Sequence, residues 1–218
     1  MRAAATRGLT HLAITDHERI DGALAVRKVA PPELTIIVGE EIRSAECDLI
    51  GLYLEEAIPA GLPAADTARR IHEQGGLVGL PHPYDRFRSS GGARLLEAEL
   101  DELLDVVDYI EVFNARLVGS GNHRAAELAA RRKLPGAAVS DAHTVFEVAV
   151  SYVAVDGPVE SAADLRAVLP GAKLVMSRGS YYARAVTPVA KIVQRWRGNS
   201  RRPGDVPPTS TPTASSSR

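Results

Sequence analysis

The sequence is poor in cysteine and has no excess of either charge. Cys47 is the single cysteine of the 218 residues, which excludes an internal disulfide and a paired-cysteine metal knuckle. Lysine and arginine number 26 against 27 aspartates and glutamates, so no global field would draw in nucleic acid or an anionic membrane. We therefore expect a reducing, intracellular compartment and no strong nucleic-acid-binding signal.

Long hydrophobic runs are also missing. No stretch approaches the roughly 18 apolar residues that a membrane-spanning helix needs. Arg7 and His11 interrupt the apolar residues near the start of the chain, so this segment does not have the pattern of a signal peptide. We expect a cytoplasmic protein with no membrane partner.

Several well-known catalytic motifs are absent as well. The sequence contains no GxxxxGK[ST] phosphate loop, no HExxH zinc helix and no GxSxG nucleophile elbow. The segment GSGNHR at 119–124 has two of the three glycines of a dinucleotide-binding loop, which is a weak nucleotide signal. These absences argue against a P-loop nucleotide hydrolase, an HExxH zinc protease and a serine hydrolase with a GxSxG elbow.

Two regions of different composition are present. Residues 197–218 are rich in proline, serine and threonine, lack apolar periodicity and contain four arginines against one aspartate. Such a segment cannot bury enough surface to offset its ordering entropy, so we expect a disordered tail. The alternative is a nucleic-acid-binding arm around Arg195, Arg197, Arg201 and Arg202. Residues 1–196 form the predicted folded domain.

Short apolar strands alternate with helices along this domain. Strands are predicted at 9–15, 34–39, 49–54, 77–80, 109–113, 136–139, 151–155 and 173–176. Helices are predicted at 2–7, 23–29, 64–74, 95–104, 125–133 and 162–168. This alternation is typical of parallel βαβ units, either in an open doubly wound sheet or in a barrel.

Polar residues follow five of the predicted strands. They are Asp16 and His17, Glu40 and Glu41, His82, Asn114, and Asp141 with His143. In a parallel barrel these carboxyl ends lie on one face, where barrel enzymes build their sites. Imidazoles and carboxylates without a thiolate suit Zn²⁺, Mn²⁺ or Fe²⁺. The set exceeds what one tetrahedral ion needs, so a two- or three-metal cluster of the kind that clamps a phosphoryl group is plausible.

Each of these residues also has a purely structural interpretation. Asp16 could cap the helix that follows it, and Asp141 could cap its turn. Glu40 and Glu41 are adjacent in a strand, so we expect one to point inward and the other to be solvated. Asp141 and His143 share one face of an extended backbone, which favours a functional pair.

Five segments resemble motifs of the polymerase-and-histidinol-phosphatase (PHP) family of metal-dependent phosphoesterases. They are LAITDHERIDGALAV, IIVGEEI, GGLVGLPHPY, YIEVFNAR and AVSDAHT. The resemblance covers roughly residues 1–190. It implies an α/β fold, a distorted seven-stranded (β/α)7 TIM-like barrel, with two or three divalent ions that activate water to hydrolyse phosphomonoesters or phosphodiesters.

The resemblance also implies roles for single residues. His17, Glu41, His82, Asp141 and His143 match positions of metal ligands, and Asp16 matches a ligand or its supporting partner. Asn114 falls where some members have another ligand, and Arg116 and Arg124 are candidate phosphate-binding residues. The implied substrate is a nucleotide or another small phosphorylated molecule.

One motif of the family is missing. Members normally begin with a strand carrying His-x-His, and the 218 residues contain no such pair. Either the start is misassigned, or the chain is truncated, or another chain fills the gap by strand addition. Exposed strand edges favour aggregation, so the first explanation is preferred, and an exposed edge could also support self-association. Without the two histidines, the alternative function is a metal-binding scaffold that does not hydrolyse its ligand.

Overall fold

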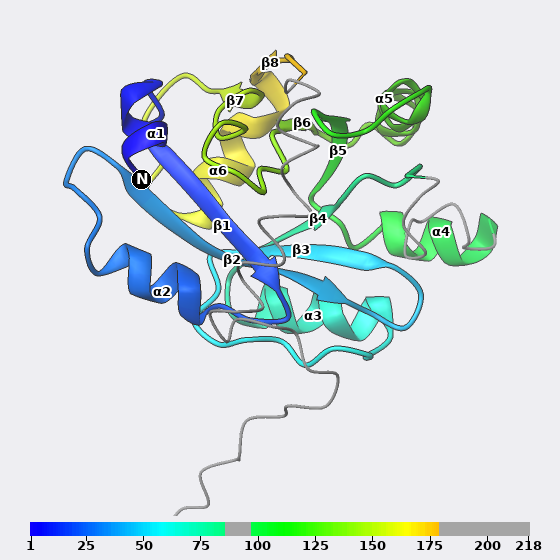
Figure 1. Cartoon of the computed structure of the whole chain (residues 1–218). Helices are drawn as coiled ribbons and strands as arrows, with labels where there is room; N and C mark the ends of the chain where they lie inside the picture. The colour runs from blue at the N-terminus through cyan, green and yellow to red at the C-terminus, as the bar shows by residue number, and fades with distance from the viewer. Residues whose placement is uncertain (86–96, 179–218) are drawn as a thin grey trace, which may run out of the picture.

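A curled six-stranded sheet forms the centre of the fold (Figure 1). The computed structural model describes residues 1–85 and 97–178, so the predicted tail at 197–218 lies outside the described residues and stays a prediction. The strands of this sheet are β1 (His11–His17), β2 (Thr35–Arg43), β3 (Asp48–Leu52), β4 (Leu77–Leu80), β5 (Tyr109–Asn114) and β6 (Gly136–Val139), in that order. A second sheet pairs β7 (Tyr152–Ala154) with β8 (Lys173–Val175).

Helices connect the strands, as the alternating pattern predicted. They are α1 (Arg2–Thr6), α2 (Asp21–Arg27), α3 (Ala64–Glu73), α4 (Glu97–Leu104), α5 (Gly121–Arg132) and α6 (Ala162–Val168), with the short 3₁₀ helix η2 (Leu169–Gly171). Among the described residues, no helix has the length and apolar character needed to cross a membrane. The predicted α/β class is confirmed.

In the six-stranded sheet, the strand directions depart from the prediction of parallel units at β3. β1 and β2 are parallel, as are β4, β5 and β6, but β3 runs antiparallel to both β2 and β4. The reason is local: a tight turn joins β2 to β3, in which Cys47 N donates to Ser44 Oγ at 3.0 Å. A turn this short can join only antiparallel strands. Five strands therefore still share one direction, and their carboxyl ends meet at one edge.

The six strands form a curled half-barrel. β7 and β8 pair antiparallel with each other in a separate sheet, and among the described residues β1 pairs with β2 alone. The seven-strand count and the missing first strand therefore stay predictions.

Apolar side chains cover both faces of the sheet. On the outer face, Val38, Leu49 and Val78 pack with helix residues such as Ile71. On the inner face, Ile37, Leu52, Leu77 and Tyr109 pack with Leu169 of η2. Burying each such side chain is worth about 1.5–3 kcal/mol, so the two layers stabilise the curl of the sheet.

A close approach inside the sheet requires glycine. A Cβ added at Gly79 of β4 would lie 2.3 Å from the Tyr109 ring on the neighbouring strand. The Tyr109 ring therefore occupies the space that a side chain at position 79 would need.

The amino-terminal edge of the sheet is held by one carboxylate, that of Asp108. Its Oδ1 accepts from Arg166 Nε at 2.9 Å, and its Oδ2 accepts from the backbone N of Val78 at 2.7 Å. His72 Nε2 lies 2.9 Å from the same Oδ2. Burial raises the pKa of Asp108, but these hydrogen bonds outweigh burial and leave it below its ordinary value. The carboxylate thus joins α3, β4, β5 and α6.

Candidate active site

The carboxyl-terminal edge of the sheet gathers most of the residues singled out in the sequence. In the β1–β2 ladder, His17 is directly opposite Glu41, so the two side chains share the inner face. The distance from His17 Nδ1 to Glu41 Oε2 is 3.4 Å. Glu41 is only 8% exposed, so a buried carboxylate here faces an imidazole from the neighbouring strand.

Asp16 and Glu40 form the next pair of this ladder and lie on the opposite face. Asp16 is exposed, and an added Cβ at Gly22 of α2 would lie 2.6 Å from its Oδ2. The Asp16 carboxylate therefore lies over the start of α2, which has no side-chain cap, and its role as a metal ligand or supporting partner stays a prediction.

The expectation that Glu40 is solvated is wrong. Glu40 is fully buried, because the chain after β3 covers the outer face, and its Oε2 accepts from Ile58 N at 2.8 Å. Burial raises the pKa of Glu40 to about 7. Strand alternation correctly places Glu40 on the outer face. It does not predict that the chain around Ile58 covers this face and excludes solvent from it.

His82 joins the site from the segment after β4. Its side chain is 4% exposed, and its Nε2 lies 3.3 Å from Glu41 Oε1. Glu41 therefore faces His17 with one oxygen and His82 with the other. The backbone at His82 is in the left-handed region, with φ of 27°, and its N donates to Glu111 Oε2 at 3.1 Å.

Glu111 and Asn114 bring β5 into the site. A register shift against β6 lies between Glu111 and Phe113, and this irregularity lets residues three apart face the same side. Asn114 Nδ2 donates to Glu111 Oε2 at 3.3 Å and to Asp141 Oδ2 at 3.2 Å. Asn114 is therefore a bridge between two carboxylates.

The pKa of Glu111 is raised to about 7. Burial is the main cause, the charges of Asp141 and Glu41 add to it, and the charge of His82 opposes it. The charges of two neighbouring carboxylates therefore act on the buried Glu111.

The loop after β6 supplies Asp141 and His143. Asp141 has a left-handed backbone, with φ of 47°. His143 Nδ1 lies 2.9 Å from the Asp141 carbonyl oxygen and 3.5 Å from Asp141 Oδ1. The predicted pair is brought together, and Asn114 connects it to Glu111 on β5.

The two candidate phosphate-binding arginines, Arg116 and Arg124, each contact another side chain of the protein. The Arg116 guanidinium forms an ion pair with the buried carboxylate of Glu147. The Arg124 guanidinium lies over the Tyr84 ring, 4.0 Å from its centre.

Sequence reasoning missed Glu111, Glu147 and Tyr84. Glu111 had a detectable signal, because it is the one charged residue within the strand YIEVFN. Glu147 and Tyr84 had none, since the arginine that each of them contacts lies far along the chain.

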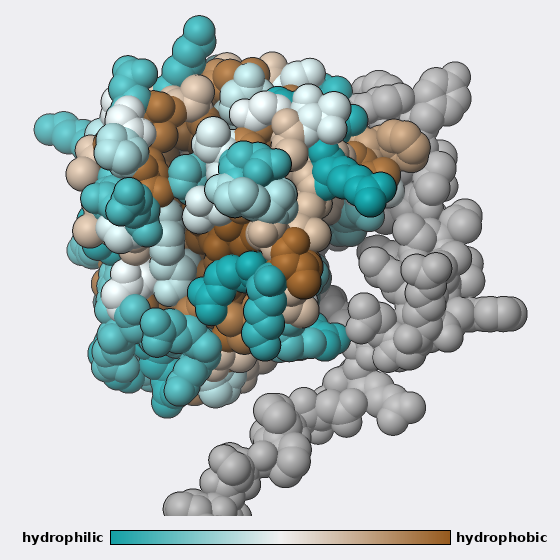
Figure 2. All heavy atoms as spheres, turned by 90° about the vertical axis from the view of Figure 1, so that its left-hand side faces the viewer, coloured by the Kyte–Doolittle hydropathy of each residue, from teal (hydrophilic) through white to brown (hydrophobic). Residues whose placement is uncertain are grey.

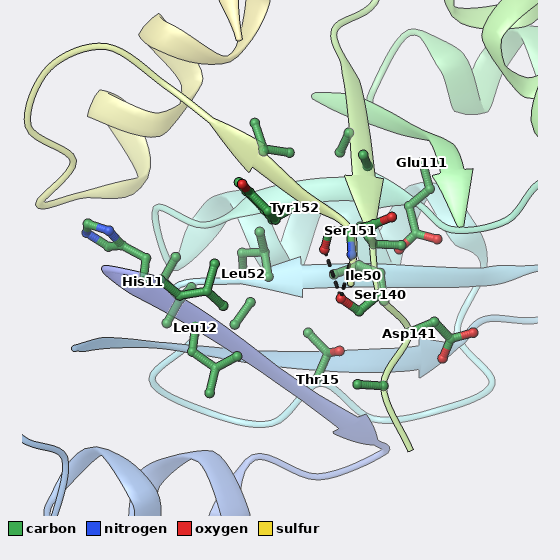
Figure 3. A pocket seen from close by; sticks show the side chains of 18 of the residues that line it. His11, Leu12, Thr15, Ile50, Leu52, Glu111, Ser140, Asp141, Ser151 and Tyr152 are labelled. Atoms are coloured by element: carbon green, nitrogen blue, oxygen red, sulfur yellow. Dashed lines mark hydrogen bonds between the residues drawn. The ribbon is translucent and has the colours of Figure 1, made fainter. Parts of the chain in front are cut away.

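A cavity of about 1050 Å³ lies within the curl of the sheet. Glu111 and Asp141 lie at one end of it and His11 at the other, with Leu12, Ile50 and Leu52 between them (Figure 3). On the face that carries β1, apolar side chains are visible in a hollow bordered by polar ones (Figure 2). The cavity thus has a charged end at the carboxyl edge and an apolar interior.

The donor chemistry of the charged end fits a divalent cation. Glu41, Glu111 and Asp141 concentrate negative charge, while His17, His82 and His143 offer imidazole nitrogens, a combination that suits Zn²⁺, Mn²⁺ or Fe²⁺. Within residues 1–85 and 97–178, no three of these side chains are arranged around a common metal position. The types of donor atom and their charge therefore fit a divalent cation, but the described side chains are not arranged around one metal position.

Comparisons with known proteins match parts of this chain. A family model described as PHP-associated matches residues 119–172. The chain is 37% identical over 116 residues to the uncharacterized protein MJ1587 of Methanocaldococcus jannaschii, covering 53% of this chain and 64% of that one. It is 40% identical over 118 residues to MJ0417 of the same organism, covering 54% and 50%. The chain thus covers between half and two thirds of the length of these relatives.

Solved structures show the same fold. PsfC from Pseudomonas syringae superposes with a TM-score of 0.63 at 16% identity, over 90% of this chain and 87% of that one. A two-domain protein from Bacteroides vulgatus, described as containing a predicted PHP-like metal-dependent phosphoesterase, gives 0.66 at 17%, over 81% and 59%. A lesion-specific endonuclease, EndoQ from Pyrococcus furiosus, gives 0.56 at 14%, over 79% and 51%. At these identities the likeness is one of fold.

Proposed function

We propose that this chain is a protein of the PHP family that hydrolyses phosphoesters with the help of divalent metal ions. The observation that carries the proposal is the convergence of Glu41, Glu111 and Asp141 with three histidines at one end of the cavity. The charges of Asp141 and Glu41 raise the pKa of Glu111 in a buried site, and a cation bound there would relieve this repulsion.

Two groups of residues would hold the metal. Glu41 with His17 and His82 forms the first, and Asp141 with His143 forms the second. Mn²⁺, Zn²⁺ or Fe²⁺, in a cluster of two or three ions, suits this donor set. Such ions supply Lewis-acid activation of water and neutralise charge on a phosphoryl group.

The remaining residues of the site orient these ligands. Asn114 donates to Asp141 and thereby fixes the direction of its carboxylate. Glu111 accepts from the backbone N of His82 and holds the left-handed turn that aims the imidazole at Glu41. Fixed ligands lower the reorganisation needed when charge develops on a phosphoryl oxygen.

The cavity favours a small phosphorylated substrate. Its volume of about 1050 Å³ lies near the upper end of the usual range for small-molecule pockets, about 300–1000 Å³. The similar fold of a lesion-specific endonuclease makes a nucleic-acid phosphodiester the alternative substrate. We propose Arg124, which lies over Tyr84, as a substrate-binding residue beside the site.

We further propose that an additional strand pairs with β1 in the complete active domain. Ala13 faces the inner side of β1, opposite Ile37, yet it is exposed. A strand there would cover it and border the cavity, whether it comes from upstream in a longer chain or from a second copy.

The direct test is hydrolysis of p-nitrophenyl phosphate and bis-p-nitrophenyl phosphate, with Mn²⁺ and with a chelator. We expect metal-dependent turnover that disappears in His82→Ala and in Asp141→Ala. His123→Ala is the matched control, because His123 is 77% exposed on α5. Mn²⁺ binding without turnover would favour the scaffold function, and turnover that survives both site substitutions would refute the assignment.

A further inference from the structure

We propose that Glu147 is a positioning residue that holds Asp141 and His143 in place, an inference that rests on the proposed function of the site. Glu147 lies in the loop after β6 and is 2% exposed. It is not among the residues that line the cavity, so it acts through the loop that carries the two predicted ligands.

The Glu147 carboxylate collects donors from both sides of this loop. Its Oε2 accepts from the backbone N of His143 at 3.1 Å and from Thr144 Oγ1 at 3.0 Å. Its Oε1 pairs with the guanidinium of Arg116, which follows β5. A buried carboxylate is stable only when its oxygens are satisfied in this way, so the loop and the ion pair form together.

The same loop is tied to β5 by a second route. Asn114 Nδ2 contacts Asp141 Oδ2 at 3.2 Å, and Asn114 Oδ1 accepts from the backbone N of Arg116 at 2.9 Å. Arg116 then reaches Glu147, which returns to His143. The chain of contacts closes on itself, so the positions of Asp141 and His143 are fixed relative to the end of β5.

The loop needs such support because its backbone is strained. Asp141 and Ala149 both lie in the left-handed region, with φ of 47° and 59°. Residues other than glycine adopt this conformation only when their surroundings impose it. Where the loop begins and ends, Ser140 Oγ donates to Ser151 O at 2.8 Å, as Figure 3 shows. Between these two residues, Glu147 holds the loop through its hydrogen bonds to His143 and Thr144.

Arg116 gains a different role from this arrangement. Its guanidinium neutralises the buried Glu147 carboxylate, so we place it in the support of the ligand loop rather than on the substrate. Loss of an outer partner of a metal ligand typically weakens metal affinity 10–100-fold, and this is the size of effect we expect.

The first test needs no metal. Amide hydrogen exchange of the metal-free protein should show protection at His143 that is lost in Glu147→Ala and reduced in Glu147→Gln, which keeps an acceptor but no charge. Glu127→Ala, on an exposed glutamate of α5, is the matched control. Unchanged protection at His143 in Glu147→Ala would overturn the proposal, even if the protein proves not to bind Mn²⁺.

The second test separates positioning from general stability. Calorimetric titration should show Mn²⁺ affinity falling at least about tenfold in Glu147→Ala. In a background that carries both Asp141→Ala and His143→Ala, the same substitution should change the affinity less than about twofold, because both ligands that Glu147 positions are gone. An equal loss in both backgrounds would contradict the proposal. If Glu147→Ala fails to fold, Glu147→Gln and Arg116→Gln carry the same comparison.

Discussion

The two ends of the sheet use carboxylates in opposite ways. At the amino-terminal edge, hydrogen bonds from Arg166, Val78 N and His72 leave the pKa of Asp108 below its ordinary value. At the carboxyl-terminal edge, burial together with the charges of Asp141 and Glu41 raises the pKa of Glu111 to about 7. The first edge stabilises the fold, whereas the second concentrates like charges that a bound cation would relieve.

The largest effect should come from Glu41→Gln, which alters the carboxylate that faces both His17 and His82. We expect metal-dependent turnover to fall by at least about 100-fold, because even outer partners of metal ligands contribute 10–100-fold. The free energy of unfolding of the metal-free protein should change little, since the substitution removes one of three neighbouring negative charges. Phosphate release measures turnover, and urea unfolding measures stability. A large loss of stability in Glu41→Gln would contradict the view that the carboxyl-terminal edge serves function and the amino-terminal edge stabilises the fold.

Asp108→Asn should have the reverse profile. It weakens the hydrogen bonds from Arg166 and leaves a half-exposed guanidinium without its charge partner, so we expect a loss of about 2 kcal/mol in unfolding free energy. Turnover of the folded protein should stay within about twofold. Asp101→Asn is the matched control: its side chain is 64% exposed beside Arg132, and we expect a change within about 0.5 kcal/mol.

Gly79→Ala should also lower stability, through packing rather than charge. The new Cβ would lie 2.3 Å from the Tyr109 ring, and overpacking of this kind costs about 1–3 kcal/mol. Gly171→Ala is the control, since nothing lies within 4 Å of a Cβ there. The midpoint of thermal unfolding should be clearly lower for Gly79→Ala than for Gly171→Ala. Equal midpoints would mean that the Tyr109 ring moves aside without loss of stability, which would contradict this prediction.

The smallest effect is the pH dependence of the Asp108 contribution. Because the folded-state pKa of Asp108 lies below its ordinary value of 3.8, its ionised form adds stability at pH above that value. This stability is lost as the pH falls through the folded-state pKa. The difference between wild type and Asp108→Asn in urea unfolding should therefore be constant near neutral pH and shrink in acid. A difference that grows in acid would contradict the assigned pKa direction.

The carboxyl-edge residues were predictable because strand ends leave a local pattern. Strand alternation separates Asp16 from His17, yet it could not say that Glu40 would be enclosed near Ile58. The antiparallel direction of β3 followed from a turn whose tightness depends on a Ser44 side-chain bond. Glu147 was invisible to the sequence, since its partner Arg116 is 31 residues away and no pattern marks such a pair.

Cation binding at the carboxyl-terminal edge is the property that the proposed function requires most. The most direct measurement is a Mn²⁺ titration followed by electron paramagnetic resonance, on the wild-type chain and on Glu41→Gln. We predict saturable binding to the wild type that weakens at least about tenfold in Glu41→Gln. Equal binding to both proteins, or none to the wild type, would contradict the account.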